Sequence, residues 1–137
     1  MKKSLSQKLA DNLDYFVSNP KRRCFLGVYG CKYHGETLGI KTKGCFIGAL
    51  LPVATRRMLD ENKVTNIFNV IEYCKENNIK LPKMITDNRN LMSYFQLLHD
   101  ANHFWNENGL SNEGISELNF IINEYNLDRE PFEKFLN

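Results

Sequence analysis

Apolar side chains recur at helical spacing over most of this chain. The first such stretch predicts a helix that Ser4 or Ser6 can cap and that Asn19-Pro20 ends. Its members fall on one side of the helix and leave the other side to polar residues, which is the pattern of a helix packed against a core. This stripe consists of Leu5, Leu9, Leu13 and Phe16.

The next part of the chain breaks the helical pattern. Residues 24–42 contain four glycines at short spacing with aromatic residues among them, which is typical of a β-hairpin or an irregular β segment. Residues 44–51 are apolar on every side, so they predict a buried central helix that Pro52 ends or bends.

Four further helices are predicted after Pro52. Thr65 is the expected N-cap of a helix ending near Asn77-Asn78, and residues 79–86 form a connection. Asp87 then caps a helix that Asn108-Gly109 closes, Ser111 caps another, and Asp128 caps a last short one. Their apolar stripes are Ile67, Val70, Ile71 and Cys74; Leu91, Tyr94, Phe95, Leu98 and Ala101, extending toward Trp105; Ile115, Leu118, Ile122 and Tyr125; and Phe132, Phe135 and Leu136.

These elements predict a mainly α (α+β) fold. We expect a single-domain helical bundle of about five to six helices, spanning residues 1–137, with a small β-hairpin or irregular insert near residues 24–42. The chain has 137 residues, of which 42% are hydrophobic and 25% charged, enough for one sizeable core and too few for two. No window is apolar enough for a membrane span or a signal peptide, so we expect a cytoplasmic protein with reduced cysteines and no membrane contact.

Charge is divided between two parts of the chain. Residues 15–59 carry eight bases against one acid, and residues 100–137 carry eight acids against two bases, so the overall charge of +2 hides local values of +7 and −6. Either the two parts face each other in the fold, or a basic surface is left for phosphates or an acidic partner.

The basic and aromatic segment over residues 21–43 is the predicted binding surface. Arginine forks and flat rings suit a nucleotide, a single strand or an acidic protein. No nucleic-acid motif accompanies them, and the low net charge argues against a duplex binder. A solvated basic face, partly neutralised by the acidic helices, is the alternative. The predicted binding residues are Lys21, Arg22, Arg23, Tyr29, Lys32, Tyr33, Lys41 and Lys43.

Two histidines four residues apart, His99 and His103, form the sharpest chemical signal. On one helix they can share a zinc ion, with Glu124 as third ligand and Asp100 where metalloproteases place their general base. Aspartate is one methylene shorter than the glutamate of that motif, so its carboxylate lies further from the water. The alternative, which we expect, is that both rings flank the apolar stripe in a structural role.

The cysteines give two weaker signals. Cys24, Cys31, His34 and Cys45 are a candidate Cys₃His zinc set, because Cys31-x-x-His34 is short enough for one knuckle. The sequence lacks the paired C-x-x-C knuckles typical of structural zinc sites. Cys45 could act as a nucleophile at a helix start, but its apolar neighbours favour a buried thiol. We therefore expect no metal, no cofactor and no catalytic residue.

Several segments carry a resemblance to a known family. They are GCFIGALL at residues 44–51, Leu81-Pro82, LLHD at residues 97–100, and WNxxGLSxxGI at residues 105–115. Together they resemble a loose family of small uncharacterised phage and bacterial proteins that pair a C-x-[IL]-G-x-L segment with a downstream L-x-x-L-[NH]-D motif. The resemblance covers roughly residues 31–122 and implies a phage or bacterial origin and a mostly helical fold, but no activity. His99 stands where we expect asparagine in the family.

These observations predict a non-catalytic intracellular binding protein. The resemblance implies a phage accessory protein that engages a host or defence component through the basic aromatic surface. The alternatives are a metal-dependent hydrolase on the HDxxH motif and a nucleotide or single-stranded nucleic-acid binder. The expected partner is a protein or a phosphorylated small molecule, and a homo-oligomer that joins basic to acidic faces stays open.

Overall fold

The computed structural model describes residues 3–23 and 44–137, and within them the chain is mainly helical, as predicted. The α-helices are α1 (Leu5–Val17), α2 (Val53–Glu61), α3 (Ile67–Glu76), α4 (Lys83–Thr86), α5 (Arg89–Asp100) and α6 (Asn112–Glu124). Short 3₁₀ helices are η1 (Pro20–Arg22), η3 (Gly48–Leu50), η4 (Asn102–Phe104) and η5 (Glu130–Phe135), and the strands are β1 (Trp105–Asn106) and β2 (Gly109–Leu110). The insert predicted near residues 24–42 lies outside the described residues.

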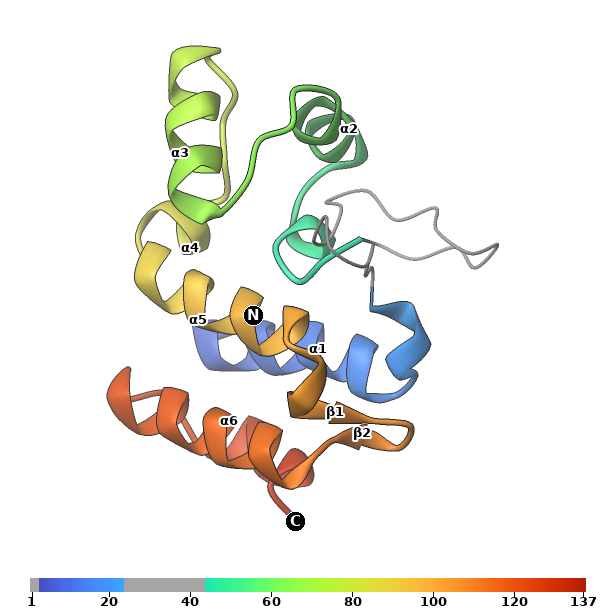
Figure 1. The fold of residues 1–137 in the computed structure, drawn as a ribbon. Helices are drawn as coiled ribbons and strands as arrows, with labels where there is room; N and C mark the ends of the chain where they lie inside the picture. The colour runs from blue at the N-terminus through green and yellow to red at the C-terminus, as the bar shows by residue number, and fades with distance from the viewer. Residues whose placement is uncertain (1–2, 24–43) are drawn as a thin grey trace.

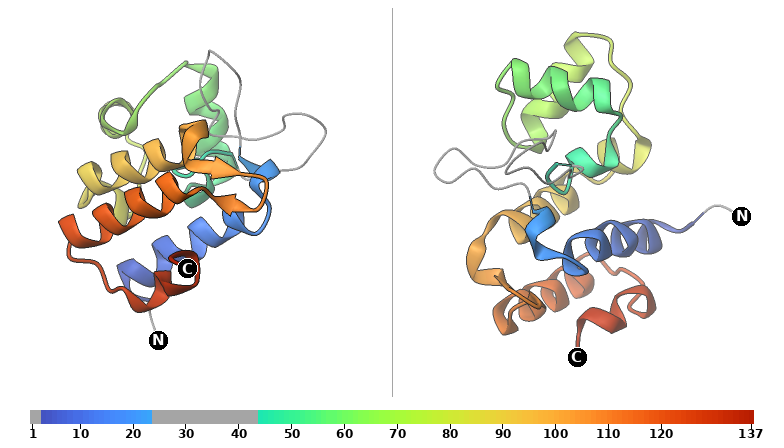
Figure 2. Two further views of the ribbon diagram at one scale, coloured as in Figure 1. Left: turned by 60° about the horizontal axis from the view of Figure 1, so that its bottom comes forward. Right: turned by 90° about the vertical axis from the view of Figure 1, so that its right-hand side faces the viewer.

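Helices α5 and α6 form an antiparallel pair joined by η4 and the β1–β2 hairpin (Figure 1). Helix α1 contacts the hairpin and η5, while α3 and α4 contact α5. The two further views in Figure 2 agree that α2 and α3 lie at the end of the molecule away from α6. The pair of α5 and α6 is therefore covered on one side by α1 and η5.

Four phenylalanines from distant parts of the chain form the centre of the core. Phe46 stacks on Phe95, with ring centroids 5.0 Å apart, and Phe95 stacks on Phe132 at 6.2 Å. Phe16 lies 6.4 Å from Phe46, and all four side chains are fully buried. Because each ring removes a large apolar area from water, this cluster ties α1, residues 44–51, α5 and η5 into one core.

The central helix predicted over residues 44–51 is wrong. The segment is buried as expected, but it forms turns and the short helix η3. Polar side chains from two neighbouring helices satisfy its backbone: Asn12 donates to the Phe46 carbonyl at 2.9 Å, and Gln96 accepts from the Ile47 amide at 3.0 Å. Backbone bonds within the segment pair the amides of Ala49, Leu50 and Leu51, so the two side chains complete the hydrogen bonding of a buried segment that is not a regular helix.

The predicted helix closed by Asn108-Gly109 also ends earlier than expected, at Asp100. The chain then turns so that the buried indole of Trp105 donates to the Leu98 carbonyl at 2.7 Å. Gly109 has a φ of +134° and serves the hairpin instead of a helix end. The long helix of the sequence analysis is therefore a helix followed by a 3₁₀ turn and a hairpin.

The structure confirms some of the predicted N-caps and corrects others. Ser4 caps α1 and Ser111 caps α6, each through its side chain. For α3 the cap is Asn66 instead of Thr65, because the Asn66 side chain accepts from the Asn69 amide. Helix α2 was not predicted at all, and α4 forms within the expected connection.

Candidate functional site

The structure describes three of the eight predicted binding residues. Lys21 is exposed, whereas Arg22 and Arg23 are half-buried. Tyr29, Lys32, Tyr33, Lys41 and Lys43 lie outside the described residues, so the basic surface as a whole stays a prediction.

Arg23 closes the C-terminal end of α5. Its Nε donates to the His99 carbonyl at 2.7 Å, and its Nη2 donates to the Asp100 carbonyl at 3.2 Å and to Oδ1 of Asn102 at 3.1 Å. The guanidinium also lies over the Trp105 ring, 4.9 Å from its centroid. The last carbonyls of a helix lack intrahelical donors, so a cation at this place both satisfies them and complements the helix dipole. Arg23 therefore has a structural role.

Arg22 contacts α1 in a similar way. Its Nη1 donates to the Tyr15 carbonyl at 3.0 Å, and the guanidinium lies 4.6 Å from the centroid of the Tyr15 ring. The contact lies near the C-terminal end of α1, where a positive charge is favourable. Of the described basic residues of the predicted surface, only Lys21 extends its side chain as an exposed cation.

His99 is buried in the core, with about 1% of its surface exposed. Its Nδ1 lies 2.9 Å from Oδ1 of Asp100, and the ring packs edge-on against Phe16 with centroids 4.7 Å apart. Desolvation lowers the pKa of His99, which outweighs the opposite effect of the hydrogen bond to Asp100. The buried Nε2 has no hydrogen-bond partner in the described part of the chain, which suits a neutral ring that donates from Nδ1.

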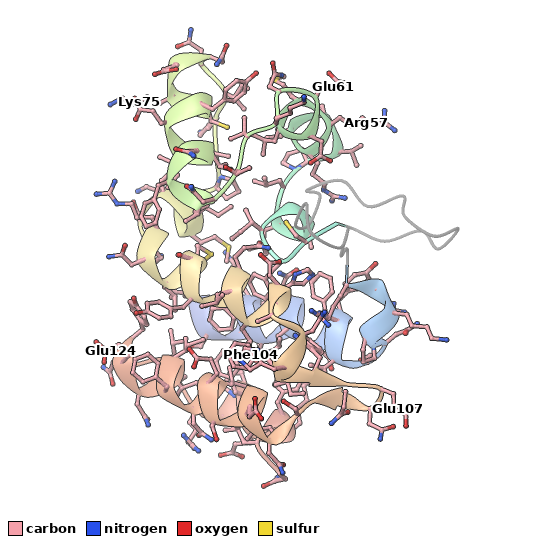
Figure 3. All side chains as sticks on the ribbon, in the orientation of Figure 1. Arg57, Glu61, Lys75, Phe104, Glu107 and Glu124 are labelled. Atoms are coloured by element: carbon pink, nitrogen blue, oxygen red, sulfur yellow. The ribbon has the colours of Figure 1, made fainter. Side chains whose placement is uncertain are left out.

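The candidate zinc set of His99, His103 and Glu124, the alternative to a structural role, does not assemble. His103 lies in η4, outside α5, with its exposed ring beside Phe104, so the two histidines do not share a helix face. Glu124 ends α6, about 18 Å along the helix axis from its first turn. Figure 3 shows Glu124 at this end of α6, away from the labelled Phe104. Among residues 3–23 and 44–137, no three His, Cys, Asp or Glu side chains come together in a metal-binding group.

The cysteines that the structure describes are buried free thiols. Cys45 accepts a hydrogen bond at its Sγ from the Gly48 amide at 3.3 Å. Burial raises the pKa of the Cys74 thiol, which disfavours the reactive thiolate. Cys24, Cys31 and His34 lie outside the described residues, so the Cys₃His set is not described as a group.

Large apolar side chains gather on the solvent side of α5 and α6. Leu97 is 52% exposed and Phe120 is 46% exposed. Tyr94 lies between the two helices, with its ring centroid 6.0 Å from that of Phe120 and 5.7 Å from that of Tyr125. Leu97 follows Tyr94 by three residues and so lies on the same side of α5. We call the surface formed by Tyr94, Leu97, Phe120 and Tyr125 the α5–α6 face.

An acidic stripe runs along α6 through this face. Glu113, Glu117 and Glu124 share the exposed side of the helix with Phe120, because the four positions recur at intervals of four, three and four residues. The ion pairs between described residues, Lys3–Asp11 and Lys134–Asp14, involve other carboxylates, so neither of them neutralises this stripe. The exposed aromatic ring therefore sits among negative charges.

A shallow groove of about 550 Å³ adjoins Phe120 where η4 packs on α6. Its walls combine two phenyl rings and the His103 imidazole with two carboxylates and contain neither lysine nor arginine. Gly114 permits the close packing beneath it, because a Cβ there would lie 2.1 Å from the Phe104 carbonyl oxygen. The groove is lined by His103, Phe104, Asn112, Glu113, Ser116, Glu117 and Phe120.

Sequence reasoning missed the α5–α6 face, although a signal was present. Leu97 and Phe120 fall outside the apolar stripes of their helices, whose buried members include Leu98 and Leu118. A large apolar residue off the stripe of an amphipathic helix is expected to be exposed. Two such residues on consecutive helices, one of them flanked by glutamates, indicate a contact surface.

No protein family model, curated protein or solved structure matches this chain. The resemblance to phage and bacterial proteins therefore stays a prediction. Every helix over residues 3–23 and 44–137 is too short or too polar to cross a lipid bilayer.

Proposed function

We propose that this protein is a non-catalytic binding protein that docks a partner protein on its α5–α6 face. The observation that carries the proposal is the exposure of Leu97 and Phe120 on neighbouring helices, with the Tyr94 ring of α5 packed against Phe120. Aromatic and aliphatic side chains held in a rigid helix pair are typical anchors of protein interfaces. A phage accessory role, in which the partner is a host or defence component, is compatible with this surface and stays a prediction.

The exposed side chains of this face are more suited to binding a partner than to stabilising the fold. Leu97 and Phe120 keep about half of their surface in water, so they contribute less to folding than the fully buried Leu98 and Leu118. The core beneath the antiparallel pair, which includes Phe95, holds the two helices in place. The backbone that carries the exposed side chains is therefore rigid. A rigid surface costs little ordering entropy on binding.

The test is selection from a random peptide library displayed on a carrier. The double variant Leu97→Ser/Phe120→Ser is compared with Val53→Ser/Phe68→Ser, because Val53 and Phe68 are 44% and 45% exposed on α2 and α3. We expect peptides selected on the wild type to lose binding to the first variant and to keep binding to the second, with both variants folded by circular dichroism. Equal binding to both variants, or no selection at all, contradicts the proposal.

The basic surface predicted from the sequence remains a second contact to test. Lys21 is its exposed described member, and Arg22 and Arg23 have the structural contacts given above. Lys21→Ala should leave binding at the α5–α6 face unchanged, since Lys21 lies at η1 and lines none of the groove.

A further inference from the structure

We infer that the partner segment held by the α5–α6 face is a basic amphipathic helix, with lysine or arginine beside an apolar anchor. The inference rests on the proposed function and adds the chemistry of the ligand. It is drawn from the charge of α6, the groove beside Phe120 and the spacing of the exposed apolar side chains.

Two features of the acidic stripe disfavour its charges in the free protein. Glu113 lies in the first turn of α6, where the helix dipole favours a carboxylate, but Glu124 ends the helix, where the dipole disfavours one. Glu113 and Glu117 are four residues apart, and like charges at this spacing repel each other. A positively charged ligand relieves both unfavourable effects, and this relief strengthens its binding.

The groove adds a place for an apolar anchor. Phe104 and Phe120 contribute aromatic rings to its lining, and Glu113 and Glu117 line it as well. Lysine and arginine side chains can lay their aliphatic stems on aromatic rings and direct their charges to carboxylates. A segment that carries an apolar side chain beside a lysine or arginine is thus complementary to both the rings and the carboxylates of the groove.

A helix is the form of ligand that fits the two-helix face. Helical recognition uses apolar anchors at intervals of three or four residues, which lie on one side of the ligand. Tyr94 and Leu97 offer contacts along α5, and Phe120 offers one on α6, so a ligand helix lying along the pair can contact both. Lysines on the flanks of such a helix lie next to Glu117 and Glu124.

The probe is a labelled synthetic helix of leucine, lysine and alanine, about 18 residues long, with its leucines on one side. Two control peptides replace every lysine by glutamate or by glutamine. Binding is measured by fluorescence anisotropy at low and at high salt. We expect the lysine peptide to bind, the glutamate peptide not to bind, and the affinity of the lysine peptide to fall as salt screens the charges.

Matched variants separate the ring from the charges. Phe120→Ser should weaken binding about tenfold or more, while Phe68→Ser should change it less than about twofold. Glu113→Gln/Glu117→Gln should weaken binding by about three- to tenfold, as two partly exposed charge pairs would. The control Glu72→Gln/Glu76→Gln removes two exposed glutamates at the same spacing on α3 and should have no effect. Lys75 marks α3 in Figure 3, far from Glu124 on α6.

The outcomes distinguish this inference from the proposed function. If the glutamine peptide binds as tightly as the lysine peptide and Phe120→Ser abolishes both, the docking face stands and the basic partner is wrong. If Phe120→Ser leaves binding of the lysine peptide unchanged, the docking face itself is wrong. If native mass shows a dimer that the lysine peptide or Glu113→Gln/Glu117→Gln dissociates, the occupant is a second copy of this chain, and a separate partner is overturned.

Discussion

Replacement of Arg23 by alanine tests how the end of α5 is held. The change removes three hydrogen bonds, to the His99 and Asp100 carbonyls and to Asn102, together with the contact over the Trp105 ring. A hydrogen bond from a charged donor contributes about 1.5–3 kcal/mol, but the three share one half-buried group and water can replace part of them. We expect Arg23→Ala to lower the free energy of unfolding by about 2–3 kcal/mol, and the melting temperature by roughly 6–10 °C.

Urea unfolding followed by tryptophan fluorescence is the assay. Trp105 is the only tryptophan of the chain and lies under the Arg23 guanidinium, so its emission should shift to longer wavelength in Arg23→Ala. Arg23→Lys should recover less than half of the loss, since an ammonium cannot span two carbonyls as the planar fork does. The control is Lys21→Ala, whose exposed side chain forms no hydrogen bond with the described residues.

A small loss of stability would refute the structural role of Arg23. If Arg23→Ala loses no more than about 0.5 kcal/mol, as Lys21→Ala should, and the Trp105 emission is unchanged, then Arg23 does not close α5. If Arg23→Ala instead weakens binding to a partner at unchanged stability, the basic surface of the sequence analysis becomes the primary contact.

The remaining predictions concern His99, Gly114 and metal. Burial lowers the pKa of His99 below 6.5, so as pH falls through 6.5 the unfolded chain takes up a proton that the folded chain does not, and stability declines. Urea titrations at several pH values should show this decline, and His99→Gln should remove that part of it; parallel pH profiles would contradict the neutral buried ring. Gly114→Ala should destabilise by about 2–4 kcal/mol in thermal unfolding, because its Cβ would meet the Phe104 carbonyl oxygen, whereas Asn123→Ala on the same helix should change stability by less than about 0.5 kcal/mol. An equal effect of the two alanines would show that η4 can move aside. A chelator should leave the melting temperature unchanged, and stoichiometric zinc in elemental analysis would contradict the prediction of a metal-free fold.

The sequence predicts the elements whose information is local. Helices α1 and α6 combine a regular apolar stripe with a serine cap: α1 begins after Ser4, one of its two candidate caps, and α6 begins after the expected Ser111. The mainly α fold follows from such stripes. The helix predicted over residues 44–51 is wrong because part of their buried backbone is satisfied by the side chains of Asn12 and Gln96, which are distant in the sequence.

The candidate site depends more strongly on tertiary contacts. The HDxxH reading required a helix through His103, but α5 ends at Asp100, where Arg23 binds its last carbonyls from 76 residues upstream. Periodicity cannot show a capping group so distant. The exposure of Leu97 and Phe120 was readable from their positions off the stripes, whereas the contact of Tyr94 with α6 required the packing of the two helices.

A titration with the lysine peptide, followed by amide chemical shifts in the protein, tests the docking face most directly. Binding on the α5–α6 face predicts the largest shifts at Leu97, Glu117 and Phe120, with the amides of α3 unchanged. Shifts that cluster on α3 or around Lys21, with none at Leu97 and Phe120, would contradict the account.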